Sequence, residues 1–201
     1  MATPVALHLA QDPDADALLS RDPFALLVGM LLDQQFPMER AFAGPYVLAQ
    51  RLGTPQELDP GAVAAHDPDD FVAIMSKPPA VHRFPGSMAG RVQALAGTIA
   101  SQYGADAASL WTTAGSGPEL RDRLQALPGY GEQKAKIFVA LLGKQLGVQP
   151  DGWREAAGPY GEDGSRRSVA DVVDPGTLAQ VRSYKQEQKR AAKARTDVTG
   201  G

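Results

Sequence analysis

The sequence predicts an all-α fold, and three observations support that prediction. Apolar residues recur at helical spacing along this 201-residue chain, and no segment alternates apolar and polar residues as a half-buried strand does. Asp-Pro pairs recur, and each places a capping carboxylate before a proline suited to the first helical turn. Glycines and prolines lie largely at the expected helix boundaries. We therefore expect helices joined by short loops.

The first half of the chain is expected to form short and medium helices around one buried helix. They cover residues 12–20, the run after Asp22-Pro23, residues 38–52, and two short segments opened by Asp59-Pro60 and Asp67-Pro68. The run after Asp22-Pro23 is apolar on nearly all sides, so it should be buried. It ends in the amides of Gln34 and Gln35, and Pro37 limits its continuation.

The second half is expected to contain a helical hairpin and a basic C-terminal helix. Helices are expected over residues 88–103, residues 118–126 and residues 132–146, with a short segment capped by Ser168 and a final helix opened by Asp174-Pro175. We treat residues 1–201 as one unit of two interleaved helical lobes with a DNA-binding cleft between them. It contains a helix-hairpin-helix at 117–146, a loop at 147–164 and a basic helix at 174–195.

Composition excludes several kinds of site. The chain has no cysteine, so it has no disulfide, thiolate metal site or iron–sulfur cluster, and its three histidines show no ligand spacing. We expect no metal site built from side chains. No run approaches the ~20 apolar residues of a membrane span, and the N-terminus lacks the features of a signal peptide. We expect a cytoplasmic protein associated with the nucleoid, without a membrane partner.

The charge is unevenly distributed. The whole chain has a net charge of −3, yet the residues from Ser165 onward include eight basic and four acidic side chains. A basic end on an acidic body is compatible with docking onto a polyanion, although a solvated helix face is the commoner meaning of such a run.

The central motif is the glycine-containing hinge at residues 127–135, with the sequence LPGYGEQKA. One amphipathic helix ends at Ala126 and the next begins at Glu132, so the two helices meet at a tight turn. Gly129 and Gly131 permit positive φ and close approach of another backbone, while the first turn of the second helix presents unpaired N–H groups. The corner is a candidate anion site, and a nucleic-acid phosphate is the obvious anion.

The hinge, the apolar helix after it and Asp151, twenty residues after Gly131, resemble the helix-hairpin-helix (HhH-GPD) base-excision DNA glycosylases. That superfamily includes endonuclease III, the adenine glycosylase acting opposite oxidised guanine, and alkylpurine glycosylases. Residues 31–35 (LLDQQ) are similar to the family's early Leu-Leu-x-x-Gln helix end, and residues 87–91 (SMAGR) are similar to a segment that begins a later helix. The resemblance covers roughly residues 22–154.

The resemblance implies a duplex carrying a damaged or mispaired base as the partner, and it implies roles for particular residues. Asp151 would be the catalytic carboxylate, stabilising positive charge on the sugar or orienting water. The DNA contacts implied are Leu127, Gly129, Tyr130, Gly131, Gln133, Lys134, Gln35 and Phe36. The base pocket implied consists of Gln34, Met30, Trp153 and Arg154. An enzyme of this kind extrudes the target nucleotide from the duplex before it acts.

Departures from the family pattern narrow the chemistry. Bifunctional members carry a Schiff-base lysine two positions after the final hinge glycine, where this chain has Gln133. The adenine glycosylase has a catalytic glutamate at the position of Met30. We therefore expect a monomeric, monofunctional glycosylase without lyase activity, and no cofactor beyond a monovalent cation that hinge carbonyls could hold.

Alternatives stay open. Asp151 is also suited to capping the helix that follows it, and Trp153 suits either a core or a pocket wall. A catalytically inactive helix-hairpin-helix protein that recognises distorted DNA is the second function class. An unrelated all-α scaffold whose hinge binds no phosphate is the third. The sequence does not name the lesion.

Overall fold

The fold is all-α in the computed structural model, which describes residues 6–199, with side chains to residue 195. No strand occurs among the residues described, which confirms the predicted fold class. The helices of the first half are α1 (Pro13–Arg21), α2 (Pro23–Leu32), α3 (Met38–Arg51), α4 (Pro60–Ala65), α5 (Pro68–Ser76) and α6 (Pro85–Gln102). Those of the second half are α7 (Ser109–Thr112), α8 (Gly117–Gln125), α9 (Glu132–Gln145), α10 (Trp153–Ala157), the 3-10 turns η1 (Gly158–Gly161) and η2 (Val169–Asp171), and α11 (Pro175–Thr199).

Every Asp-Pro pair begins a helix, as predicted. The aspartate side chain accepts first-turn amides in each case, from Asp12, Asp22, Asp59, Asp67 and Asp174. Asp22 does more than cap α2, because its second oxygen accepts the N–H of Leu58 at 2.7 Å. These starts are local in origin, which is why the sequence alone locates them.

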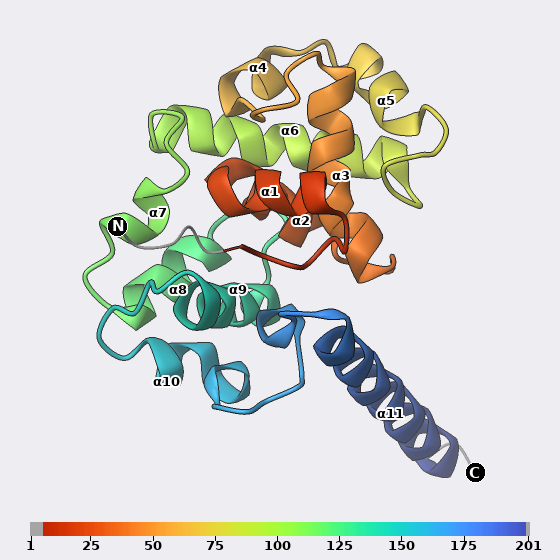
Figure 1. Cartoon of the computed structure of the whole chain (residues 1–201), viewed down its shortest axis with the longest axis vertical. Coiled ribbons are helices and arrows are strands. Elements are labelled where there is room, and N and C mark those ends of the chain that lie inside the picture. Colours follow the sequence, from red (N-terminus) through yellow and green to blue (C-terminus); the bar gives the residue numbers. More distant parts are fainter. Residues whose placement is uncertain (1–5, 200–201) are drawn as a thin grey trace.

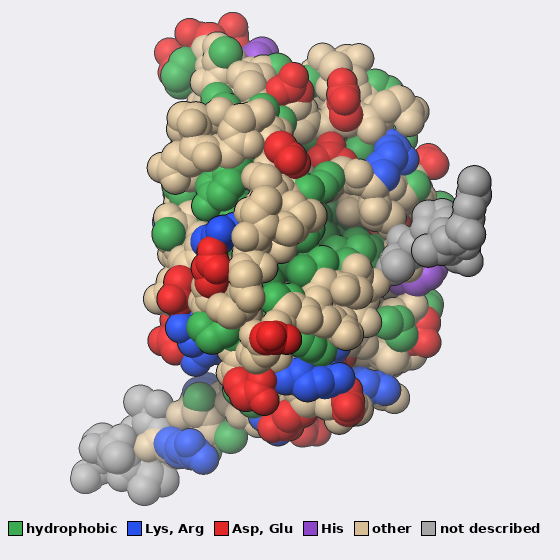
Figure 2. All heavy atoms as spheres, turned by 90° about the vertical axis from the view of Figure 1, so that its left-hand side faces the viewer, with side chains coloured by type: hydrophobic (Ala, Val, Ile, Leu, Met, Phe, Trp, Pro, Cys, Tyr) green, Lys and Arg blue, Asp and Glu red, His purple; other side chains and the backbone are tan. Residues whose placement is uncertain are grey.

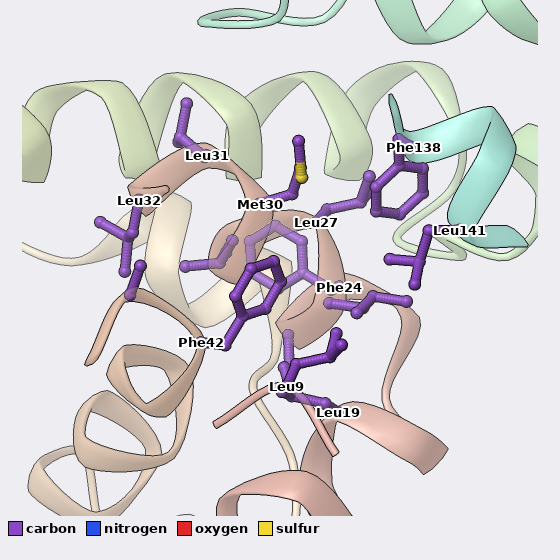
Figure 3. Close-up of a cluster of buried hydrophobic side chains, with 14 of the residues drawn as sticks. Leu9, Leu19, Phe24, Leu27, Met30, Leu31, Leu32, Phe42, Phe138 and Leu141 are labelled. Atoms are coloured by element: carbon purple, nitrogen blue, oxygen red, sulfur yellow. The ribbon is translucent and has the colours of Figure 1, made fainter. Parts of the chain in front are cut away.

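Helix α2 is the centre of the core. Each residue from Phe24 to Leu32 is buried, as expected of a helix that is apolar on nearly all sides. Figure 3 shows its side chains meeting Phe42 of α3, Phe138 and Leu141 of α9, and Leu9 of the N-terminal segment. One helix therefore contacts both halves of the chain.

The remaining helices lie on either side of α2 (Figure 1). Helix α6 packs against α4 and α5 in the upper part of that view, and α2 packs against α3. In the lower part, α9 packs against α8, α10, η1 and η2. The hairpin of α8 and α9 therefore packs together with α10, η1 and η2, and its hinge lies against the end of α2.

Helix α11 is anchored to the rest of the chain by its first turns. Leu178 and Val181 are buried, whereas residues 186–195 are all exposed. Figure 1 shows the helix leaving the body at the lower right.

Candidate nucleic-acid interface

The hinge between α8 and α9 is built around Gly129. Its φ is +79°, a backbone conformation that residues with a side chain rarely adopt. A Cβ at this position would lie 2.3 Å from the Cδ1 atom of Leu31, because α2 packs directly against the turn. The positive φ favours glycine, a Cβ would also force the Leu31 side chain to move, and the hinge is held against the end of α2.

The hinge presents two different faces. Leu127 and Tyr130 are buried in the core. The hydroxyl of Tyr130 donates to the carbonyl oxygen of Leu27 at 2.6 Å, and burial raises the pKa of this phenol well above its ordinary value. Gly131 and Gln133, in contrast, are exposed. The structure therefore uses Leu127 and Tyr130 for packing and leaves only the second face open to a ligand.

The N-terminal end of α9 is open. The first α9 amide with a backbone acceptor is that of Ala135, which donates to Gly131 at 3.0 Å. No side chain in the described part of the chain caps this end, and no atom described lies within 4 Å of a Cβ placed on Gly131. The preceding amides and the positive end of the helix dipole are thus available to an anion.

Lys134 links the first turn of α9 to the last turn of α2. Its Nζ donates to the carbonyl oxygens of Met30 at 2.6 Å and Leu31 at 3.1 Å. Burial lowers the pKa of Lys134 to about 8, an effect opposed by the nearby carboxylate of Asp33. The ammonium therefore stabilises the C-terminal end of α2 and also contributes positive charge beside the hinge.

The turn between α2 and α3 holds an exposed residue in a strained conformation. Gln35 has a φ of +51°, and its side chain is exposed. Its neighbours are fixed. The side-chain Nε2 of Gln34 donates to the carbonyl oxygen of Leu31 at 2.8 Å, and the ring centre of Phe36 lies 4.7 Å from that of buried His82. A glutamine in this region costs about 1–3 kcal/mol, and such strain is typical of functional sites.

These elements line one open cleft of about 910 Å³. Its walls are formed by the turn after α2, the first turn of α9, the returning chain at η1, and the first half of α11. The lining residues are Met30, residues 33–39, Gln133, Lys134, Ile137, Pro159, Tyr160, Arg167, Arg182, residues 184–186, Gln188 and Lys189. We call this feature the cleft below.

Positive charge predominates in the cleft. Five cations line it, namely Lys134, Arg167, Arg182, Lys185 and Lys189, against the carboxylates of Asp33 and Glu39. Arg182 pairs with Glu39, and the Nζ of Lys185 lies 4.0 Å from Asp33 Oδ2. The second oxygen of Glu39 is buried without a hydrogen-bond partner in the described structure.

The structure brings six of the expected site residues into the cleft. They are Met30, Gln34, Gln35, Phe36, Gln133 and Lys134. Gly129 and Gly131 form the adjacent hinge. Trp153 and Arg154 do not line the cleft: Trp153 is buried against Gly143 of α9, and Arg154 donates to Gly161 at 2.7 Å. For Trp153 the core interpretation therefore agrees with the structure.

Asp151 lies at the other end of the hairpin from the hinge. Its carbonyl oxygen accepts the N–H of Gly117 at 2.7 Å, and Gly117 begins α8. The nine residues of α8, about 13 Å of helix, separate this contact from the hinge. The side chain does not cap α10 either, because the capping position is occupied by Gly152 without a side-chain hydrogen bond. Asp151 is thus close neither to the open end of α9 nor to the cleft.

The loop after α9 explains this placement. The N–H of Val148 donates to Leu142 at 3.1 Å, and the amide of Gln149 donates to Gly143 at 2.9 Å, so the loop is bound to the C-terminal end of α9. The chain returns to the hinge only after α10, where Gln133 donates to the hydroxyl of Tyr160 at 2.9 Å. The residue that the returning chain brings beside the first turn of α9 is therefore Tyr160, and Asp151 lies elsewhere.

Sequence reasoning did not find four residues that the structure brings to this region. Tyr160, Arg167 and Glu39 line the cleft, and none belongs to a motif that spacing could detect. Phe84 lies just before α6 with 47% of its surface exposed and the guanidinium of Arg83 5.2 Å from its ring centre. The exposure of the Phe84 ring cannot be derived from a local sequence signal.

Two further features concern cofactors and membranes. Among the residues described, no group of three or more His, Asp or Glu side chains could hold a metal ion. A monovalent cation held by hinge carbonyls stays a prediction. No helix in the described part of the chain is both long and apolar enough to cross a membrane.

Comparison with known proteins adds no relative. No protein-family model, curated protein or solved structure matches this chain. The resemblance to the base-excision glycosylases therefore rests on the motifs alone.

Proposed function

We propose that this chain binds duplex DNA at a damaged or mispaired base and that the cleft receives the distorted nucleotide. One observation carries the proposal: the open amide end of α9 and the strained, exposed Gln35 belong to the same positively charged cleft. The protein would act as a nucleoid-associated monomer in the cytoplasm. The helices on the two sides of the cleft would correspond to the two lobes expected from the sequence.

The cleft offers the two kinds of contact that such a ligand needs. Backbone amides near Gly131 suit a phosphate, which positions a duplex without reading its sequence. The amide side chains of Gln34 and Gln35 suit the edges of an unpaired base, and the rings of Phe36 and Tyr160 suit its faces. Extrusion of a nucleotide costs a few kcal/mol and is easiest at a weakened base pair, so the binding would favour distorted DNA.

A monofunctional DNA glycosylase is the second candidate. The observation that favours it is the pair of carboxylates in the cleft, Asp33 and Glu39, because hydrolysis of an N-glycosidic bond needs negative charge near the sugar. Gln133 in place of a Schiff-base lysine favours hydrolysis without strand cleavage. Asp151 lies outside the cleft, so we favour DNA binding over catalysis by Asp151 as the proposed function.

A panel of duplexes separates these functions. Each 25-bp duplex carries one modified base or an abasic analogue, and the assays record affinity, release of free base and strand scission. We expect tighter binding to distorted duplexes than to the undamaged control. If the wild type releases free base, and Asp33→Asn loses this release but still binds the duplex, the second candidate is established. Equal affinity for all duplexes would contradict recognition of distortion, and no binding at low salt would leave only the scaffold interpretation.

A further inference from the structure

The C-terminal helix continues the charged wall of the cleft into solvent. Arg182, Lys185, Lys189 and Lys193 follow one another at spacings of three, four and four residues. At 100° per residue these positions fall within about 80° of the helix circumference, so they form one stripe. Arg182, Lys185 and Lys189 line the cleft, and Lys193 extends the same line beyond it. We call these four residues the α11 stripe.

The outer half of α11 has the charge of a polyanion-binding element and lacks the surface of a protein-packing one. From residue 182 to residue 195 the chain has six basic residues and one acidic residue. Every residue from 186 to 195 is exposed, and alanines are the only apolar residues there. A partner helix needs an apolar stripe that this segment does not have. Charge complementarity therefore selects a polyanion over a protein surface.

The outer part of the stripe, Lys189 and Lys193, keeps cations close together without a carboxylate partner among the described side chains. Lys185, Lys189 and Lys193 are successive i,i+4 neighbours, an arrangement that destabilises an isolated helix. Within the described chain, no carboxylate pairs with Lys189 or Lys193. Figure 2 shows basic and acidic side chains interspersed on the face drawn, with no continuous basic surface over the body. On that face the body therefore offers no alignment of cations like that of the α11 stripe.

Arg182 and Lys185 of the stripe are paired with carboxylates. They pair with Glu39 and Asp33, which lie on the opposite wall of the cleft. Phosphates entering the cleft would replace these carboxylates as partners of the two cations. The stripe spans about 17 Å, a length over which each strand of a duplex carries about five phosphates.

We propose that α11 is a second DNA-binding element, whose stripe follows the phosphate backbone of the duplex flanking the cleft. This inference rests on the proposed function, since α11 would bind the part of the same DNA ligand that lies beside the cleft. Contacts of this type do not depend on sequence, and each releases counterions that make binding depend on salt.

The test measures the salt dependence of binding for the full-length protein and a K189Q/K193Q variant. The probe is a 30-bp duplex with a central abasic analogue, followed by fluorescence anisotropy from 50 to 200 mM salt. We expect the slope of log affinity against log salt to be shallower by about 0.9 for each lysine removed. Far-UV circular dichroism confirms that the variant retains its helices.

Two control variants make the result specific. K189R/K193R keeps both charges and should retain the slope, while R21Q/K77Q removes two exposed charges outside the cleft and should leave the slope unchanged. A wild-type slope in K189Q/K193Q, with the wild-type protein binding the duplex, would overturn the role of α11 alone. No binding by the wild-type protein would overturn the proposed function as well. Tighter binding to a 30-bp RNA duplex would overturn DNA as the partner.

Discussion

Lys134 of α9 donates a hydrogen bond from its ammonium group to the carbonyl oxygen of Met30 at 2.6 Å, joining the hairpin to the C-terminal end of α2. The same ammonium donates to Leu31, whose side chain packs on Gly129 of the hinge. Lys134 therefore helps to fix the open end of α9 relative to the turn that holds Gln35, together with the hydrogen bond from Tyr130 to Leu27.

Replacing Lys134 with methionine tests that dependence. The change keeps the apolar stem and removes hydrogen bonds from a charged group to two carbonyls, which are worth about 1.5–3 kcal/mol. It also removes the cost of burying the ammonium, which offsets part of that loss, and we expect a net fall in the free energy of unfolding. Urea denaturation measures it. Lys136→Met is the matched control, because Lys136 pairs with the exposed Glu132 and its loss should cost less than about 1 kcal/mol. An equal loss of unfolding free energy in the two variants would show that the contact of Lys134 with α2 stabilises the fold no more than an exposed ion pair does.

The pKa of Lys134 gives the pH dependence of stability a definite sign. Burial lowers this pKa to about 8 in the folded chain from 10.5 in the unfolded chain. Between these values the unfolded state binds the proton and the folded state releases it, so stability through this group rises with pH from about 8 to 10.5. The DNA affinity should change in the opposite direction as the ammonium charge is lost above pH 8. The measurement compares the DNA affinity of the wild type and of Lys134→Met from pH 7 to pH 9.5. The same change of affinity with pH in both proteins would refute this role of the charge.

Gln35→Gly should separate stability from recognition. Glycine removes the strain of the positive φ, about 1–3 kcal/mol, and loses part of that gain to the freedom of the unfolded chain. We therefore expect a net gain of about 1 kcal/mol in urea denaturation, together with weaker discrimination between distorted and undamaged duplexes. Unchanged discrimination would remove Gln35 from the recognition site.

Asp171 is expected to be essential for the wall of the cleft that precedes α11. Its buried carboxylate accepts hydrogen bonds from Lys144 at 2.7 Å, from Ser165 at 3.1 Å, and from the backbone amide of Arg167 at 2.9 Å. Asp171→Ala leaves Lys144 without its partner, and we expect a loss of about 3–5 kcal/mol by urea denaturation. The control is Asp163→Ala, which breaks an exposed pair with Arg154 and should cost less than about 1 kcal/mol.

The features that the sequence predicted correctly are those that depend on residues close together in the chain. The Asp-Pro starts, the buried character of α2 and the glycine hinge follow from capping, composition and backbone freedom, and each appears where expected. The proximity of Gln35 to Lys134 came from a resemblance, and the cleft contains both residues.

The position of Asp151 could not be predicted, because spacing counts residues and does not specify the path of the chain. Two hydrogen bonds, from Val148 and Gln149 to the end of α9, direct the loop away from the hinge. Tyr160 and Arg167 reach the cleft through α10 and η1, and the sequence contains no motif for that return. The cleft therefore combines a predicted hinge with a wall that only tertiary contacts define.

Hydrogen–deuterium exchange of the backbone amides tests the central claim most directly. The measurement compares the free protein with the complex formed with a duplex that carries a central abasic analogue. We expect slower exchange at the first turn of α9, Gln133 and Lys134, and at Gln35, with no change around Asp151. Slower exchange around Asp151 without any at the first turn of α9 would contradict the account.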